Sequence, residues 1–247
     1  MDNGKQRVLI LDIETSPITA YVWGLKDQNI SLNQIVKDWH IMAWAAKWLG
    51  EPAKKITYMD TRKYSEEFIL NFLWELLDEA DILITQNGKG FDSPKINARF
   101  IHYGMKPPSP YKHLDTYLIA RNTAQFTSNK LEYLTDKLCT KYKKLSHKKF
   151  PGMSLWTECL KGNNAAWNEM RTYNIHDVLS TEELYTKLQA WVPVTAPAIY
   201  NSGACSVCGK HHLQRRGSSV KNRFVYQRYQ CQDCGKWSLG ERLKEPK

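Results

Sequence analysis

A short, almost uninterrupted apolar stretch near the amino terminus constrains the fold more than any other feature. Residues 7–13 read Arg-Val-Leu-Ile-Leu-Asp-Ile, which is too short for a typical helix and lacks the alternation of a strand with one solvent face. Such a run is typical of a strand that is buried on both faces. It predicts a central strand in a sheet flanked by helices.

The hydrophobic pattern of the following chain changes period several times. Short apolar and aromatic runs predict further strands, the first three of them as antiparallel neighbours in the same sheet. Helical spacing of apolar residues behind Ser65 and behind Pro94 predicts two helices, and later segments repeat that pattern. The expected strands are 20–25, 41–48, 56–59, 81–85 and 113–116, and the expected later helices are 116–121, 129–138 and 165–189. This alternation predicts an α/β domain with a mixed sheet.

Two acidic side chains lie at the end of the predicted central strand. Asp12 and Glu14 are two residues apart, so they point to the same face of the sheet. Two carboxylates that are about 5 Å apart in a medium with an effective dielectric constant of ~20 repel each other by roughly 3 kcal/mol. A divalent cation would offset that repulsion. The alternative interpretation is a strand end whose acids lie in solvent.

Two more acids lie in settings that favour a ligand site only in combination with the first pair. Asp92 follows a turn with two glycines and precedes Ser93-Pro94 at the start of a helix, where it is equally suited to cap that helix. Asp177 lies one turn after Tyr173 on the apolar stripe of the last helix. A carboxylate that faces a core requires a partner, and a metal ion supplies one.

These residues form three motifs in order along the chain. They are Asp12-x-Glu14, Asn87-Gly88-x-x-Phe91-Asp92-x-Pro94 and Tyr173-x-x-x-Asp177. Over about residues 7–189 the set resembles the motifs of DEDD-type 3′–5′ exonucleases, and the proofreading domain of family B DNA polymerases in particular. The tyrosine four residues before the last aspartate is similar to the tyrosine variant of that family. His176 matches neither variant and is interpreted as structural.

The resemblance implies an RNase H-like fold and a stand-alone 3′–5′ exonuclease that hydrolyses phosphodiester bonds with two Mg²⁺ or Mn²⁺ ions. It implies that Asp12, Glu14 and Asp177 hold one ion, and that Asp12 bridges to a second ion secured by Asp92. Tyr173 would orient the attacking water, since a phenol that titrates near pH 10 is a poor base. DNA is favoured over RNA only because the motifs resemble those of polymerases.

Three residues near the motifs are candidates for supporting roles. Asn87 and Phe91 are candidates for contacting the terminal nucleotide, by hydrogen bonding and stacking respectively. Asp115 ends a short predicted strand and is either an auxiliary acid or, more simply, a helix cap. Two other functions stay open: a structure-specific endonuclease of the same fold, and a catalytically silent nucleic-acid-binding module that recruits a replication or transcription partner.

Four of the six cysteines form two Cys-x-x-Cys pairs separated by 22 residues, and each pair is followed by glycine. Four thiolates satisfy a tetrahedral Zn²⁺ ion, so the pattern predicts one structural zinc ion in a zinc ribbon. The ligands are Cys205, Cys208, Cys231 and Cys234. Zinc also explains how so small a module folds, because about 40 residues bury too little surface to fold unaided. Cys139 and Cys159 are interpreted as buried apolar residues.

Positive charge is concentrated in this cysteine module. Of the net charge of +10, the 43 residues from Cys205 onward contribute ten Lys and Arg against three Asp and Glu. Basic residues interleaved with aromatics favour nucleic-acid binding, with Arg223 and Arg228 as candidate contacts, over a ribbon that uses its aromatics only as a core. A second basic run, residues 141–149, contacts phosphate or lies in a solvated loop.

The overall composition predicts a globular protein with two modules. Hydrophobic residues make up 42% and charged residues 24%, which argues against disorder. We expect an RNase H-like domain over 1–191, a proline-containing linker over 192–202 and the ribbon over 203–247. No signal peptide or membrane helix is evident, so the expected location is the cytoplasm, or the host cytoplasm if this compact enzyme serves a phage or another virus.

Overall fold

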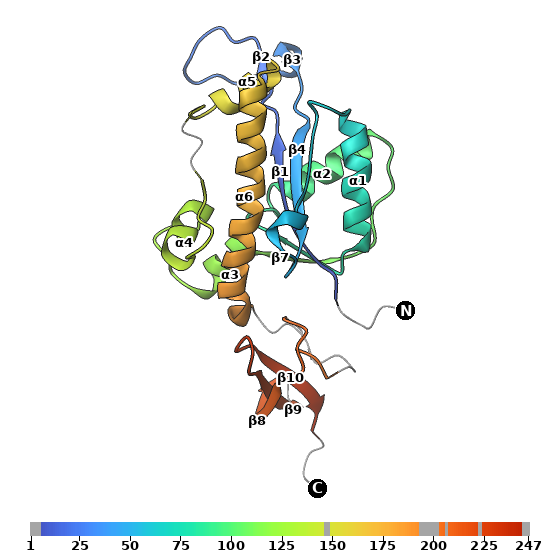
Figure 1. Cartoon of the computed structure of the whole chain (residues 1–247), viewed down its shortest axis with the longest axis vertical. Helices are drawn as coiled ribbons and strands as arrows, with labels where there is room; N and C mark the ends of the chain where they lie inside the picture. The colour runs from blue at the N-terminus through green and yellow to red at the C-terminus, as the bar shows by residue number, and fades with distance from the viewer. Residues whose placement is uncertain (1–5, 146–148, 193–202, 206, 222–223, 244–247) are drawn as a thin grey trace.

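The computed structural model describes residues 6–145, 149–192, 203–205, 207–221 and 224–243. The larger part of the chain is a five-stranded mixed sheet of order β5-β4-β1-β6-β7 with helices on both faces (Figure 1). Its strands are β1 (Val8–Thr15), β4 (Ile41–Trp48), β5 (Thr57–Asp60), β6 (Ile82–Thr85) and β7 (Lys112–Asp115). The helices are α1 (Glu66–Glu79), α2 (Asp92–His102), α3 (Thr116–Thr123), α4 (Leu131–Leu138), α5 (Ser154–Leu160) and α6 (Asn164–Leu188). The predicted α/β domain with a mixed sheet is confirmed.

Strand β1 lies at the centre of the sheet, antiparallel to β4 and parallel to β6. Its odd-numbered residues, including Leu9 and Leu11, pack in one core with the buried faces of α1 and α2. Its even-numbered residues Val8 and Ile10 pack in a second core with α3, α4 and α6. Both faces of β1 are therefore covered, which is why its sequence is a continuous apolar run.

The expected strand over residues 20–25 is wrong. Only β2 (Thr19–Ala20) and β3 (Ile35–Lys37) pair here, and they form a separate two-stranded hairpin outside the main sheet. The side chains of Tyr21, Trp23 and Leu25 lie in solvent, so their apolar character does not reflect burial in a sheet. A run of apolar and aromatic residues forms a strand of a sheet only where other elements pack on at least one face of that strand.

Helix α6 crosses the face of the sheet that is opposite to α1 and α2 (Figure 1). Its amino terminus is capped by Asn163, whose Oδ1 accepts hydrogen bonds from the backbone N–H groups of Ala165 and Ala166. Short α5 precedes it and packs against its first turns in a small core with Met42 of β4. No helix within the described part of the chain is both long and apolar enough to cross a membrane.

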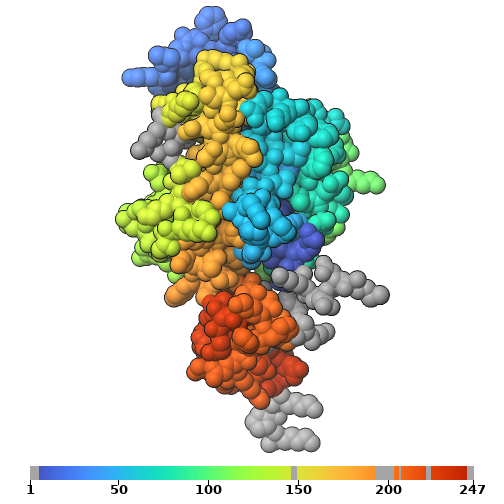
Figure 2. Space-filling model, viewed as in Figure 1, coloured from blue at the N-terminus to red at the C-terminus, as the bar shows by residue number. Residues whose placement is uncertain are grey.

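The carboxyl-terminal module is a three-stranded antiparallel sheet of order β10-β9-β8. Its strands are β8 (Leu213–Lys221), β9 (Phe224–Cys231) and β10 (Trp237–Arg242). Figure 2 shows this module at one end of the molecule and the β2–β3 hairpin at the other. Cys205 and Cys231 belong to the same buried cluster as Tyr185 and Leu188 of α6. The module is therefore packed against the end of α6.

Candidate active site

Asp12 and Glu14 project from β1 toward α6. They continue the even-numbered series begun by Val8 and Ile10, which packs on the α6 side of the sheet. The side chain of Glu14 is buried, and its Oε2 accepts a hydrogen bond from the indole N–H of Trp156 in α5, with a nitrogen–oxygen distance of 3.0 Å. The carboxylate of Glu14 thus lies inside the protein and not in solvent.

Asp92 is the first residue of α2 and is buried, with 3% of its surface exposed. Its Oδ1 accepts a hydrogen bond of 3.1 Å from the backbone N–H of Ile13, the residue between Asp12 and Glu14. This bond ties the start of α2 to the acid-bearing end of β1. The position is at the carboxyl ends of the parallel strands, where α/β sheets commonly bind ligands.

The turn before α2 is held in one conformation by its neighbours. Asn87 has a positive φ of 62°, and a Cβ added to Gly88 would lie 2.2 Å from Oγ1 of Thr85, so only glycine fits there. Asp115 accepts hydrogen bonds from the backbone N–H groups of Asn87 and Lys89 at 2.8 Å and 3.0 Å. It also caps α3, which is the simpler of the two roles expected for it.

Asp177 lies on the face of α6 that meets β1, and 3% of its surface is exposed. One turn earlier, the amide of Asn174 donates to Oδ2 of Asp12 at 2.6 Å and to the backbone carbonyl of Asp12 at 3.2 Å. On the other side of Asp177, Nζ of Lys144 lies 2.6 Å from its Oδ2. Among the described residues, Lys144 is therefore a cationic side chain in direct contact with one of the acids.

Two aromatic rings complete this part of the site. The ring of Tyr173 contacts that of Trp156 edge to face, with 6.2 Å between centroids. Nζ of Lys144 lies 4.6 Å from the centroid of the Tyr173 ring. Burial and the nearby Asp177 raise the pKa of Tyr173 to about 12, so its hydroxyl keeps its proton at neutral pH. Burial alone would lower the pKa of Lys144, but Asp177 and Tyr173 outweigh that effect and raise it.

The electrostatics show that the four acids interact with one another. Burial, followed by the charges of Asp177, Asp92 and Glu14, raises the pKa of Asp12 well above its usual value. Burial and Asp177 raise the pKa of Glu14 to about 8. Burial also raises the pKa of Asp92 to about 7, against the hydrogen bond from Ile13. Four carboxylates from β1, α2 and α6 thus lie close enough to oppose each other's ionisation.

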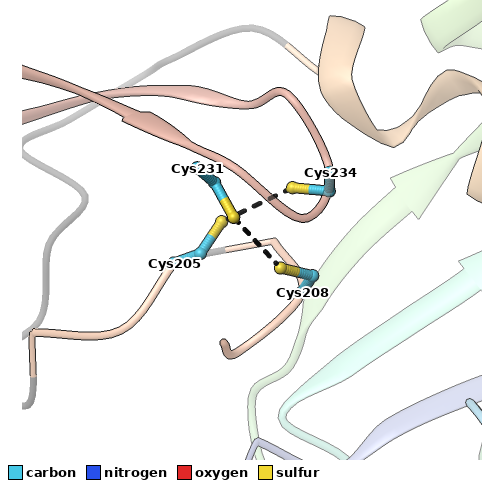
Figure 3. A group of neighbouring side chains, drawn as sticks. All are labelled: Cys205, Cys208, Cys231 and Cys234. Atoms are coloured by element: carbon cyan, nitrogen blue, oxygen red, sulfur yellow. Dashed lines mark hydrogen bonds between the residues drawn. The ribbon is translucent and has the colours of Figure 1, made fainter. Parts of the chain in front are cut away.

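The carboxyl-terminal cysteines form a tighter cluster. Among the residues that the structure describes, they are the group of metal-ligand atoms that all lie within 4.8 Å of one another. Their sulfur atoms point toward a common centre, two from each turn (Figure 3). The sulfur atoms of Cys208 and Cys231 are 3.6 Å apart, and those of Cys205 and Cys234 are 3.7 Å apart. These distances agree with the spacing of about 3.8 Å expected for a tetrahedron of sulfur ligands at ~2.3 Å from zinc. The four residues of this cluster are Cys205, Cys208, Cys231 and Cys234.

Comparisons with known proteins agree with this geometry. Residues 41–189 match the model of a family described as the RNase H superfamily. This chain belongs to the RNase H superfamily. Domains of this superfamily are typically nucleases that act on nucleic acid. A comparison with curated protein sequences finds no significant match.

The fold of this RNase H superfamily chain is also similar to a solved polymerase structure. That structure is the family B DNA polymerase from the hyperthermophilic archaeon Pyrobaculum calidifontis, with a TM-score of 0.54 and 14% sequence identity. The similarity covers 91% of this chain and 32% of the polymerase, so the chain spans about a third of the polymerase's length. At this level of identity the likeness concerns the fold alone.

The acid site of this RNase H superfamily chain fits divalent cations by its chemistry. Its donors are carboxylate oxygens, which Mg²⁺ and Mn²⁺ prefer. Burial raises the pKa of Asp12, Glu14 and Asp92, and the charges of neighbouring acids raise those of Asp12 and Glu14 further, so a cation would stabilise the ionised forms. Unlike the cysteine sulfurs, the acids in the described residues are not gathered within 4.8 Å of one another. A cation bound by several of them would have to draw these oxygens closer.

Three residues of this site were missed by sequence reasoning. Lys144 was assigned only to a basic run, because a loop position gives no sign that its side chain reaches Asp177. Trp156 comes from α5, a short helix without a clear apolar period. Asn174 carried a usable signal, since it lies three residues before Asp177 and therefore on the same helical face.

The predicted substrate contacts lie at several places on the surface. Asn87 and Phe91 are exposed beside the start of α2, and Nζ of Lys95 lies 5.4 Å from the Phe91 ring. Arg228 is exposed on β9 with its guanidinium 4.7 Å from the Trp237 ring. Arg223, and Lys148 of the basic run, lie outside the described residues.

Proposed function

We propose that this chain is a metal-dependent 3′–5′ exonuclease that hydrolyses the phosphodiester bonds of nucleic acid, with DNA favoured over RNA. The convergence of four acids from β1, α2 and α6, three of them buried, carries the proposal. The raised pKa values of Asp12, Glu14 and Asp92 indicate a site that favours a cation. Members of the superfamily are typically nucleases. The position of Tyr173, four residues before Asp177, supports the exonuclease assignment.

The roles that we assign follow the positions of the side chains. Asp12, Glu14, Asp92 and Asp177 would hold two Mg²⁺ or Mn²⁺ ions. Those ions would lower the pKa of the attacking water and stabilise the charge on the leaving 3′ oxygen. Tyr173, whose hydroxyl stays protonated, would orient the water by hydrogen bonding instead of removing its proton.

Lys144 and Asn174 position the acids in this proposal. Asn174 donates to both the side chain and the backbone of Asp12, which keeps that carboxylate turned toward α6. Lys144 neutralises Asp177 until a metal ion binds. With cations held by the acids, the ammonium group of Lys144 would be available to contact the phosphate of the substrate.

We infer that the carboxyl-terminal module is a zinc ribbon that strengthens the grip on nucleic acid. Its exposed Arg215, Arg216 and Arg228 lie on neighbouring strands β8 and β9, and the cation–π contact of Arg228 holds its guanidinium at the surface. A positive surface of this kind binds phosphates without regard to sequence. We place the domain boundaries at 1–191, 192–202 and 203–247.

A labelled-strand assay tests the proposed activity. With Mg²⁺ or Mn²⁺, the protein should shorten a 5′-labelled single strand one nucleotide at a time, and Asp12→Ala should reduce the rate by at least about 10³-fold because it removes one of the acids that would hold the ions. Asp136→Ala, an exposed acid outside the site, is the matched control and should cleave normally. Internal cuts without a ladder would indicate an endonuclease, and binding without cleavage would indicate a silent module.

A further inference from the structure

The β2–β3 hairpin presents an unusual number of large apolar side chains to solvent. Four of them are almost fully exposed: Tyr21 at 77%, Trp23 at 98%, Leu25 at 100% and Leu32 at 87%. We call these four residues the hairpin platform. Single exposed apolar residues need no explanation, but a group of this size on one loop indicates a surface that binds another molecule.

The hairpin platform is held in place by its backbone. The backbone N–H of Tyr21 donates to the carbonyl of Gln34 at 2.9 Å, and the side-chain amide of Gln34 donates back to the carbonyl of Tyr21 at 2.9 Å. The backbone N–H of Ser31 donates to Oε1 of Gln34, also at 2.9 Å. Gln34 therefore links both arms, and the apolar side chains are displayed by an ordered support.

The hairpin is continuous with the proposed active site. Its first strand begins three residues after Ser16, which lies two residues beyond Glu14, and Ser16 is hydrogen-bonded to His40, three residues after β3. The backbone N–H of Ser16 donates to the carbonyl of His40 and the N–H of His40 donates to Oγ of Ser16, both at 2.9 Å. In Figure 1 the hairpin lies at the same end of the molecule as α5, the helix whose Trp156 donates to Glu14. The segment that carries the hairpin platform is thus joined through Ser16 to the strand that carries Asp12 and Glu14.

The chemistry of the surface selects the kind of occupant. Residues 17–38 contain two lysines and two aspartates, so the segment neither attracts nor repels phosphate strongly. Tyr and Trp side chains offer flat faces on which bases stack whatever their sequence, whereas a duplex conceals those faces. We propose that the hairpin platform binds the unpaired bases of a single strand whose 3′ end lies in the acid site. This inference rests on the proposed function and specifies single-stranded substrate.

Binding measurements on a cleavage-deficient protein test this inference. In zinc-loaded Asp12→Ala protein, we would measure the affinity for a fluorescein-labelled oligodeoxythymidylate longer than ~16 nucleotides. Adding Trp23→Ala should weaken binding by about tenfold, while Trp23→Phe, which keeps a stacking ring, should retain most of the affinity. Phe72→Ala removes a partly exposed ring from α1 and is the matched control, with unchanged affinity expected.

A crosslinking experiment reads the contact without relying on affinity. Strands carrying 5-iodouracil near the 3′ end should crosslink to the peptide that contains residues 21–25. If the wild-type protein cleaves single strands and the Asp12→Ala protein binds them, but adding Trp23→Ala leaves the affinity unchanged or no such crosslink forms, the inference is wrong and a protein partner becomes the better occupant. If the parent protein binds no strand at all, the proposed function fails together with it.

Discussion

Glu14 lies where its own negative charge is unfavourable. Its carboxylate is buried, faces Asp177, and receives one hydrogen bond from Trp156. Burial and Asp177 raise its pKa from 4.5 to about 8. An acid whose pKa is higher in the folded than in the unfolded protein favours folding while it is protonated. That contribution is fully present below pH 4.5 and is lost as the pH rises through about 8.

The first prediction concerns Glu14→Gln in zinc-loaded protein without Mg²⁺ or Mn²⁺. The neutral amide keeps an acceptor for Trp156 but adds no charge, so this variant should melt at least about 2 °C above the wild type near pH ~9 and show little difference near pH ~5. Thermal unfolding followed by circular dichroism measures both midpoints. Glu75→Gln, at an exposed position of α1, should show no such pH-dependent difference. A variant that is less stable at every pH would contradict the account.

At the scale of elements, the turn before α2 determines where Asp92 lies. The turn is held by a hydrogen bond to Asp115 and by the close contact between Gly88 and Thr85. Asp92, which follows the turn, accepts a hydrogen bond from the backbone N–H of Ile13 in β1. The acid site therefore depends on contacts among β1, β6, β7 and α2, and not on the acids alone. Sequence motifs describe the acids but not these contacts.

The second prediction tests this dependence with two glycines of one turn. Gly88→Ala would place a Cβ 2.2 Å from Oγ1 of Thr85, so the turn must shift, which should cost about 1–3 kcal/mol of unfolding free energy. The same change should reduce cleavage by displacing Asp92. Gly90→Ala is the matched control, because its Cβ would meet no atom closer than 3.6 Å. Denaturant unfolding and the labelled-strand assay measure the two effects, and equal behaviour of both variants would refute this view of the turn.

The elements also show what the sequence can and cannot predict. The continuous apolar run of β1 and the helical period of α1 were sufficient, because burial on both faces or on one stripe leaves a clear pattern. The hairpin was mistaken for a strand of the main sheet, since its exposed Trp23 and Leu25 resemble core residues. Lys144 could not be predicted because its contact with Asp177 joins residues 33 positions apart through tertiary packing.

For the whole molecule, the main feature is that the carboxyl-terminal cysteine module shares a core with the RNase H-like domain. Cys205 and Cys231 pack with Tyr185, Leu188 and Val192 at the end of α6. Asp177 lies further back on the same helix. A zinc ion that orders the cysteines should therefore stabilise the helix that carries part of the acid site.

The third prediction concerns loss of zinc. Removing it with a chelator, or changing Cys231 to serine, should lower the thermal midpoint of the entire protein by at least about 5 °C in a single transition, because the ribbon and α6 unfold together. It should also weaken oligonucleotide binding by disordering Arg228. Calorimetry and fluorescence anisotropy measure these effects, and returning zinc should restore the chelated protein. An unchanged main transition beside a separate ribbon transition would show that the two parts are independent.

The most direct test of the central claim is whether the four acids bind divalent cations. Titration of zinc-loaded protein with Mn²⁺, followed by electron paramagnetic resonance of the free ion, should show saturable binding that falls at least about tenfold in affinity in Asp12→Ala and in Asp177→Ala. Asp136→Ala should bind like the wild type, since that acid lies outside the site. Absent binding in the wild type, or equal binding in all four proteins, would contradict the account.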